Sequence, residues 1–323
     1  MAQSHSRPRK RRGRPVNGIL LLDKPIGISS NAALQTAKRL FGAAKAGHTG
    51  NLDVEATGLL PVCFGEATKV CQFLLDADKR YLSEFTLGRR TTTGDSEGET
   101  VYERPTDGIS LAQIEAAIAT FRGPIEQLPP MHSALKHKGQ PLYKLAHQGI
   151  EVERQKRTVT IHSYEVLAFD NPRLEVAVSC SKGTYVRTLA EDLGELLGCG
   201  GYVSRLRRDG VGPYNLADAW TLERLEWLAQ RGEAELDRSL LPIDGALQLM
   251  PRVDLAAESS FYLERGNAVL VPKAPTSGLL RLYDDLGRFI GVGEVLSDGR
   301  VAPRRLFRLP ATEAAGESAR SSA

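Results

Sequence analysis

Residues 47–58 bring together side-chain types that can do chemistry: a histidine, two threonines, an asparagine and two carboxylates. An ionised carboxylate can act as a nucleophile or a base once it is held in place. Glycines at 47, 50 and 58 reach positive φ without steric cost and favour a tight, irregular loop. The chain then turns apolar over 59–64, and a polar loop leading into a buried segment can hold reactive groups at a cleft. An ordinary surface turn has the same composition, so both interpretations stay open for the loop alone.

Metal and disulfide chemistry are not expected from this sequence. Its four cysteines show no C-x-x-C spacing, and its six histidines form no H-E-x-x-H or Cys/His cluster. The cysteines fit the reduced thiols of a cytoplasmic protein. The apolar run at 19–22 is too short for a secretory signal, and no stretch approaches the length of a membrane span. We therefore expect a cytoplasmic protein with no metal and no membrane partner.

The chain is long enough for two domains, and its charge is unevenly placed. With 323 residues, 41% of them hydrophobic, it can bury a sizeable core in one large and one small domain. The net charge is +3, yet six basic residues between positions 7 and 14 precede the first acidic residue, Asp23. We expect residues 1–16 to be a disordered basic arm, which fits phosphate contact and equally a solubility or targeting tail.

Periodicity and capping residues predict the elements that position the loop. Before it we expect a buried strand over 18–22 and a helix over 32–41 capped by Asn31. After it we expect a helix over 65–75 and a strand over 81–87. Later elements are a helix over 111–121 with a Ser110–Gln113 capping box, strands over 158–169, 174–180 and 203–209, and helices over 185–197 and 222–230, the second of these capped by Thr221.

Arg187 stands out in the first turn of the helix expected over 185–197. A cation in that place opposes the helix dipole. We therefore expect either a solvated side chain or an anion opposite it.

Residues 124–157 form a long segment interrupted by four prolines. Long irregular segments inside compact domains are often lids or binding loops. Basic residues interleaved with tyrosine and histidine fit a flap that faces nucleic acid, while a solvated lysine-rich loop explains the charge equally well. The residues concerned are Lys136, His137, Lys138, Tyr143, Lys144, Arg154, Lys156 and Arg157.

The character of the chain changes beyond Pro251. Short β-like runs at 268–271, 279–283 and 289–295 are broken by turn residues and indicate a small β-rich module. Residues 311–323 are rich in alanine, glutamate and serine, and we expect a disordered tail.

Taken together, these segments resemble the TruB-type tRNA pseudouridine synthases of bacteria, and the resemblance covers almost the whole chain. The motifs that carry it are Asn17-Gly-Ile-Leu-Leu-Leu-Asp-Lys-Pro25, Gly47-His-Thr-Gly with Leu-Asp53 and Ala-Thr-Gly58, Gly65-Glu-Ala-Thr-Lys69, Asp78-Lys-Arg-Tyr81, Ser133-Ala-Leu-Lys136, Cys180-Ser-Lys-Gly-Thr-Tyr-Val-Arg-Thr188, Leu206-Arg-Arg208 and Val301-Ala-Pro-Arg-Arg305. The resemblance implies an α+β fold, with a mostly antiparallel mixed sheet flanked by helices. It places a catalytic domain at 17–250, with an RNA-gripping insertion at 124–157, and a PUA-like RNA-binding domain at 251–310.

The resemblance also implies a reaction: uridine 55 in the T-loop of tRNA is isomerised to pseudouridine after the base is flipped out of its stack. It implies no cofactor, no guide RNA, the tRNA T-arm as partner, and a monomer. By this similarity Asp53 is the nucleophile, Arg187 its cationic partner, and Tyr81 the residue that stacks on the uracil and helps to move the C5 proton. The similarity further assigns Tyr185 and Leu206 to substrate contact and His48 to the place vacated by the flipped base.

The sequence departs from the family pattern beside Asp53. The family usually continues from a small residue or threonine into Leu-Asp-Pro-Leu, whereas this chain has Asn51, Val54 and Glu55. Val54 lacks the φ restraint of proline, and Glu55 adds a second carboxylate. We hypothesise that Glu55 points away from the pocket, since a facing like charge would raise the pKa of Asp53. Two rival functions remain open: a non-catalytic tRNA chaperone on the same fold, and a guide-RNA-dependent synthase.

Overall fold

The computed structural model describes residues 13–308 of the 323. In chain order the strands are β1 Gly18–Lys24, β2 Ala46–His48, β3 Thr57–Phe64, β4 Lys79–Leu87, β5 Arg89–Thr91, β6 Thr100–Glu103, β7 Gly123–Gln127, β8 Lys136–His137, β9 Gln140–Pro141, β10 Arg157–Asp170, β11 Arg173–Cys180, β12 Gly201–Val211, β13 Tyr214–Asn215, β14 Arg252–Asp254, β15 Leu279–Tyr283, β16 Phe289–Val295 and β17 Val301–Leu306. The α-helices are α1 Ser30–Leu40, α2 Cys71–Asp76, α3 Leu111–Ala119, α4 Leu142–Ala146, α5 Val186–Leu196, α6 Leu222–Gln230, α7 Glu233–Asp237 and α8 Ala257–Glu264, with short 3-10 helices η1 Gly65–Lys69, η2 Leu216–Asp218 and η3 Ile243–Leu247.

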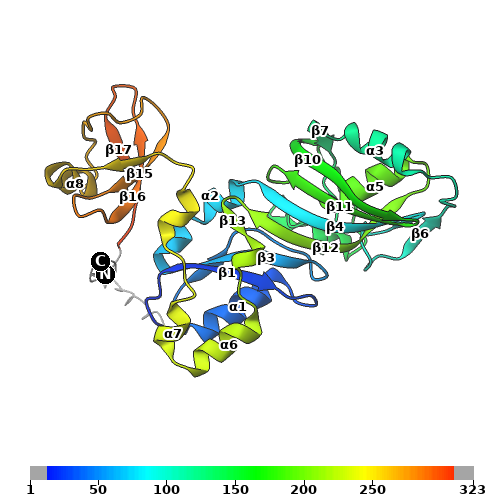
Figure 1. Cartoon of the computed structure of the whole chain (residues 1–323), viewed down its shortest axis with the longest axis horizontal. Coiled ribbons are helices and arrows are strands. Elements are labelled where there is room, and N and C mark those ends of the chain that lie inside the picture. Colours follow the sequence, from blue (N-terminus) through cyan, green and yellow to red (C-terminus); the bar gives the residue numbers. More distant parts are fainter. Residues whose placement is uncertain (1–12, 309–323) are drawn as a thin grey trace, which may run out of the picture.

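A nine-stranded sheet forms the larger part of the molecule (Figure 1). Its main path runs β1-β3-β12-β4-β11-β10-β7, while β2 joins β3 and β13 joins β12. The pairs are antiparallel except for a short parallel contact between β3 and β12. The expected α+β fold with a mostly antiparallel mixed sheet is therefore confirmed.

Helices cover the sheet at two places and create two neighbouring cores. One core joins α3 and α5 to β4, β10 and β11 through residues such as Ile114, Leu189 and Phe85. The other joins α1 and α6 to β1 and β3 through Leu34, Leu225 and Leu60. Tyr81 and Leu206 pack against both cores. This junction brings the loop between β2 and β3 and helix α5 to the same part of the sheet.

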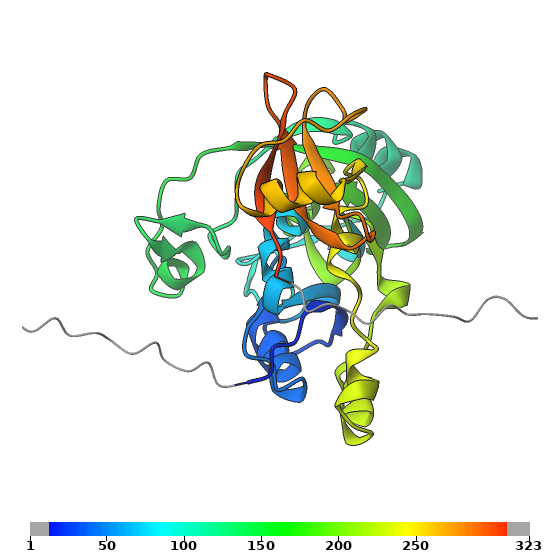
Figure 2. The ribbon, with the colours of Figure 1, turned by 90° about the vertical axis from the view of Figure 1, so that its left-hand side faces the viewer.

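Two hairpins extend from the sheet. Strands β5 and β6 form one, and its tip, residues 92–99, reaches back to the sheet, where Gly94 accepts a hydrogen bond from the Val203 N–H at 3.0 Å. The segment between β7 and β10, which we call the flap, carries β8, β9 and α4 and projects from the body (Figure 2).

The C-terminal module is a separate four-stranded sheet, ordered β14-β15-β16-β17, with α8 beside it (Figure 1). Lys69 Nζ donates to the Leu306 carbonyl at 2.7 Å, and the Arg308 N–H donates to Glu66 Oε2 at 2.8 Å. Val292 and Phe307 also share an apolar cluster with Ile19 and Leu21 of β1. The module is thus fastened to the element that directly follows β3.

Several local expectations need correction. Ser29, and not Asn31, caps α1 through a 3.1 Å bond to the Ala32 N–H, so the helix begins earlier than we expected. The single helix expected over 65–75 is divided into η1 and α2 at Val70. The run at 268–271 is not a strand, because within it only Val269 forms a bridge, with Val301.

The ends of the chain were expected to be disordered. Residues 1–12 and 309–323 lie outside the described part. Within it, Arg14 forms two bonds with Asp237, at 3.0 and 2.8 Å, and Val16 is buried, so residues 13–16 pack against the body of the protein. Across residues 13–308, the structure contains no helix both long and apolar enough to span a lipid bilayer.

Gly58 marks a point where β3 and β12 approach too closely for a side chain. Its φ is +105°, and a Cβ there would lie 2.3 Å from the Arg208 carbonyl oxygen. We expect Gly58→Ala to lower the free energy of unfolding by about 1–3 kcal/mol through overpacking, beyond a φ cost of about 1–2 kcal/mol. Gly108→Ala is the matched control, because Gly108 has a φ of +88° and open space around it. Urea denaturation measures both losses, and equal losses would contradict the close approach.

Candidate active site

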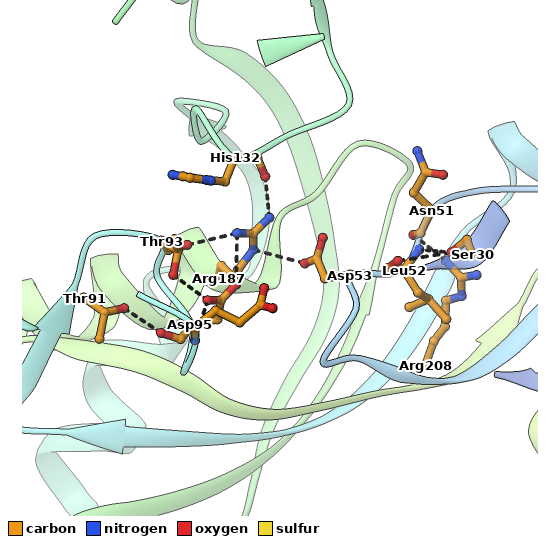
Figure 3. Close-up of polar contacts among 11 residues, drawn as sticks. Ser30, Asn51, Leu52, Asp53, Thr91, Thr93, Asp95, His132, Arg187 and Arg208 are labelled. Carbon is orange, nitrogen blue, oxygen red and sulfur yellow. Dashed lines mark hydrogen bonds and ion pairs between the residues drawn. The ribbon is translucent and has the colours of Figure 1, made fainter. Parts of the chain in front are cut away.

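The loop between β2 and β3 is held at three backbone positions around Asp53, and Figure 3 draws the contacts to Leu52 and Asn51. Buried Ser30 accepts from the Leu52 N–H at 2.8 Å and donates to the Leu52 carbonyl at 3.1 Å. Arg208 Nη1 donates to the Asn51 carbonyl at 3.3 Å. On the other side, Lys24 Nζ donates to the Val54 carbonyl at 3.3 Å. The backbone is thus fixed on both sides of Asp53, whose side chain is 44% exposed.

Lys24 is fully buried and serves the same loop. Its ammonium also donates to the carbonyls of Pro25 at 2.8 Å and Ile28 at 2.7 Å. Burial lowers the pKa of Lys24 to about 8, and the carboxylates of Asp53 and Glu55 oppose that shift. Lys24 therefore links the turn at residues 25–28 to the loop that carries Asp53, and it adds positive charge near that carboxylate.

Arg187, the second residue of α5, uses each of its side-chain nitrogens. Nε lies 3.2 Å from Asp53 Oδ2, and Nη1 lies 3.1 Å from Asp95 Oδ2. Nη1 also donates to the Thr93 carbonyl at 3.0 Å, and Nη2 donates to the His132 carbonyl at 2.6 Å. The side chain is only 7% exposed. The cation in the first turn of α5 is therefore matched by two carboxylates. Of the two expectations for Arg187, the anion opposite it is confirmed.

The charge environment of Asp53 is mixed. Protein atoms surround the carboxylate closely enough that burial raises its pKa, although part of the side chain is open to solvent. Arg187 is the strongest opposing influence on the pKa of Asp53, while Asp95 raises it. The carboxylate is accessible to a ligand and remains paired with a fixed cation.

Asp95 is a residue of this site that the sequence did not reveal. It lies in the loop between β5 and β6. Its Oδ1 accepts from the Glu97 N–H at 3.1 Å and from the Thr93 hydroxyl, and its carbonyl accepts from the Thr91 hydroxyl at 2.8 Å. The chain separates it from Arg187 by 92 residues, so no local pattern points to this contact.

Tyr81, Tyr185 and Leu206 lie around the ion pairs. Tyr81 and Leu206 occupy β4 and β12 at the junction of the two cores, and burial raises the pKa of the Tyr81 hydroxyl. Tyr185 precedes α5, and its backbone exchanges two bonds with the buried Gln127 side chain, at 3.0 and 3.2 Å. The Asp53 and Arg187 charges both act on the Tyr185 hydroxyl. Both tyrosine hydroxyls therefore lie within reach of the Asp53 charge, and Leu206 packs with Tyr81 against both cores.

His48 lies at the end of β2, on the same loop but five positions before Asp53. It is half-buried, and burial lowers its pKa. Its Nδ1 is buried without a hydrogen-bond partner among residues 13–308. The structure thus joins His48 to Asp53 through the loop backbone and shows no direct contact between their side chains in the described part.

The arrangement suits chemistry by a single carboxylate at an open site. Asp53 can attack or accept a proton, Arg187 can keep it ionised, and aromatic and aliphatic side chains can contact a planar base. Within the described range of the chain, no group of three or more His, Cys, Asp or Glu side chains is placed to hold a metal ion. All four cysteines carry free thiols.

Family models of pseudouridine synthases match three parts of this chain. Residues 38–186 match the family model of TruB family pseudouridylate synthases (N-terminal domain). Residues 187–248 match a tRNA pseudouridylate synthase B C-terminal domain, and residues 251–307 match a pseudouridine synthase II TruB C-terminal model.

Similar curated proteins cover nearly the whole chain. A tRNA pseudouridine synthase B of Pseudomonas fluorescens (strain Pf0-1) is 55% identical over 300 residues, which are 93% of this chain and 98% of the relative. A tRNA pseudouridine synthase B of Coxiella burnetii (strain RSA 493 / Nine Mile phase I) is 54% identical over 91% of this chain and 96% of the relative.

Solved structures support the fold. A chain in a Cbf5-Nop10-Gar1 complex is 24% identical, with a TM-score of 0.71, over 94% of this chain and 92% of that chain. A chain in an H/ACA RNP bound to a substrate RNA containing 2'-deoxyuridine is 22% identical, with a TM-score of 0.70, over 95% and 93%.

Removing Asp95 should destabilise the protein, because Arg187 would stay buried with less compensating charge. We expect Asp95→Ala to lower the free energy of unfolding by about 3 kcal/mol. Asp170→Ala is the control: Asp170 pairs with Arg173 at 3.0 Å, but its side chain is 82% exposed. That change should cost less than about 1 kcal/mol. Similar urea midpoints for both variants would show that the Asp95–Arg187 pair is not important for folding stability.

Proposed function

Because the chain belongs to the TruB family of pseudouridine synthases and is a tRNA-modifying isomerase, we propose that it converts uridine 55 of the tRNA T-loop to pseudouridine. The observation that carries this proposal is Asp53, open to solvent yet paired with the buried Arg187 in a loop anchored at three backbone positions. We also propose that it acts as a monomer in the cytoplasm, without a guide RNA or cofactor.

In the proposed reaction Asp53 serves as the nucleophile. The bond between uracil N1 and the ribose breaks, the base turns, and a new bond forms from the ribose to C5. The proton on C5 leaves and N1 gains one, so the product is an isomer of the substrate. A carboxylate can add to the sugar or base, or remove a sugar proton, and then leave. Arg187 would hold Asp53 ionised against the burial that raises its pKa.

The surrounding residues would bind the flipped uridine. Tyr81 would stack on the uracil and help to move the C5 proton, while Leu206 and Tyr185 would contact the base. His48 would fill the space that the base leaves in the T-loop. The placement of Tyr81 and Leu206 at one junction, and of Tyr185 beside Arg187, supports these roles.

The flap and the C-terminal module would hold the T-arm. The flap touches the site through the His132 carbonyl on Arg187. Its basic face, together with the RNA-binding role proposed for residues 251–310, would supply contacts to phosphates. Residues 17–250 would then act as the catalytic domain.

Tritium release tests the proposal most directly. With T-arm RNA carrying 5-tritiated uridine, the wild type should release tritium, and Asp53→Asn should release none above background. Asp170→Asn, an exposed carboxylate at the turn between β10 and β11, is the control that should keep wild-type release. Thermal melting checks that Asp53→Asn is folded. Release by folded Asp53→Asn at the wild-type rate would rule out Asp53 as the nucleophile.

A non-catalytic tRNA chaperone is the second candidate, because Asn51, Val54 and Glu55 depart from the family pattern. Background tritium release by the wild type, together with faster refolding of tRNA, would favour the chaperone. Activity on the isolated T-arm would separately argue against a guide-dependent synthase.

Glu55 gives a sharper test of the altered loop. It is half-buried, and its charge acts on Lys24 and Glu97, whereas the strongest charged influences on Asp53 are Arg187, Asp95, Lys24 and His132. We therefore expect Glu55→Leu to change the single-turnover rate by less than tenfold. A gain of tenfold or more, about 1.4 kcal/mol, would mean that Glu55 acts against Asp53.

A further inference from the structure

Arg208 is among the largest fully buried side chains in the structure, with 1% of its surface exposed. It lies in β12, with its Cα opposite Tyr81 of β4 on one side and Gly58 of β3 on the other. Arginine is rarely buried so completely without a carboxylate partner. Here the bonds are to carbonyl groups: Nε donates to Leu59 at 2.7 Å and Nη1 to Asn51 at 3.3 Å.

One nitrogen of this guanidinium is left without a partner. Nη2 is buried and has no hydrogen-bond partner among residues 13–308. An unsatisfied buried donor costs about 1–3 kcal/mol. An unsatisfied N–H donor inside the candidate active site therefore points to a functional role for Nη2.

The Tyr81 hydroxyl is the polar group placed to use it. Residues directly opposite each other in an antiparallel pair project to the same face of the sheet. Burial lowers the pKa of Arg208, and interaction with the Tyr81 hydroxyl opposes that change. Nη2 forms no hydrogen bond among residues 13–308, so the interaction with Tyr81 lacks the geometry of the two bonds to carbonyls.

We propose that Arg208 is a positioning residue that fixes the catalytic loop through Asn51 and orients the Tyr81 hydroxyl through Nη2. It touches neither the RNA nor the reacting atoms, because its side chain is buried. It couples the backbone that carries Asp53 to the ring that would stack on the uracil. The inference rests on the roles proposed above for Asp53 and Tyr81.

The arrangement explains why a guanidinium is needed at this position. The N–H groups of a guanidinium lie on three separate nitrogens and can point toward Leu59, Asn51 and Tyr81 in one plane. The three N–H groups of an ammonium, such as that of Lys24, share a single nitrogen and serve acceptors around one point. Gly58 allows the required closeness, because any Cβ there would collide with the Arg208 backbone.

The test uses the full-length protein with Arg208→Lys and Arg208→Gln. Single-turnover pseudouridine formation should slow by about 100-fold, as expected for a misplaced catalytic group. The dissociation constant for T-arm RNA should stay within twofold, because Arg208 is not at the surface. Arg173→Gln, in the exposed pair with Asp170, is the control and should retain both wild-type values.

A spectroscopic readout separates orientation of Tyr81 from general loss of structure. The carbon-13 signal of the Tyr81 ring carbon that bears the hydroxyl, assigned with Tyr81→Phe, should move in both variants at neutral pH. An unmoved signal, a rate within threefold of wild type, or a loss confined to RNA affinity would each overturn the proposal. If melting shows that Arg208→Gln is unfolded, Arg208→Lys decides, because it keeps the charge and most of the volume.

The outcome can be distinguished from failure of the proposed function. If Asp53→Asn still released tritium, the assignment of the nucleophile would fail. The Tyr81 signal would nevertheless show whether Arg208 contacts that hydroxyl.

Discussion

The site depends on one buried guanidinium shared by two carboxylates. Arg187 would be costly to remove from water alone, and Asp95, itself largely buried, compensates much of that cost. Asp53 meets the same cation from the open side. Two negative groups facing one positive group leave an excess of negative charge at the accessible end. Burial raises the pKa of Asp53 even though an arginine lies beside it, and the second carboxylate, Asp95, adds to that shift.

The rest of the fold holds this ion group in place. Asp53 lies on the loop between β2 and β3, and Asp95 lies on the loop between β5 and β6. Arg187 lies in the first turn of α5, which packs with α3 in one of the two cores. The sheet order brings these segments together because β12 lies between β3 and β4. Ser30, Lys24 and Arg208 then fix the backbone of the loop from α1, β1 and β12. A short polar loop thereby obtains the rigidity that preorganised catalysis requires.

Local features of the fold could be predicted from the sequence, while most long-range contacts could not. The Ser110–Gln113 capping box and the Thr221 cap are present because their signals lie within one helical turn. The prediction that Asn31 caps α1 was wrong, because Ser29 forms the N-cap two residues earlier. The family resemblance pointed to Asp53 and Arg187, and the structure brings them together. The contacts of Asp95 and of Arg208, which was named only as part of a family motif, could not be predicted, because their partners lie far away in the chain, where neither periodicity nor spacing gives a signal.

The contact between the flap and Arg187 has a consequence for sequence variation. Arg187 bonds to the backbone carbonyl of residue 132 and not to its side chain. Any amino acid with the same backbone path supplies that carbonyl, so the histidine at 132 can be exchanged without removing the bond. An insertion or deletion in the flap would instead shift the carbonyl itself. Tolerance at this position is therefore broad for substitutions and narrow for changes in length.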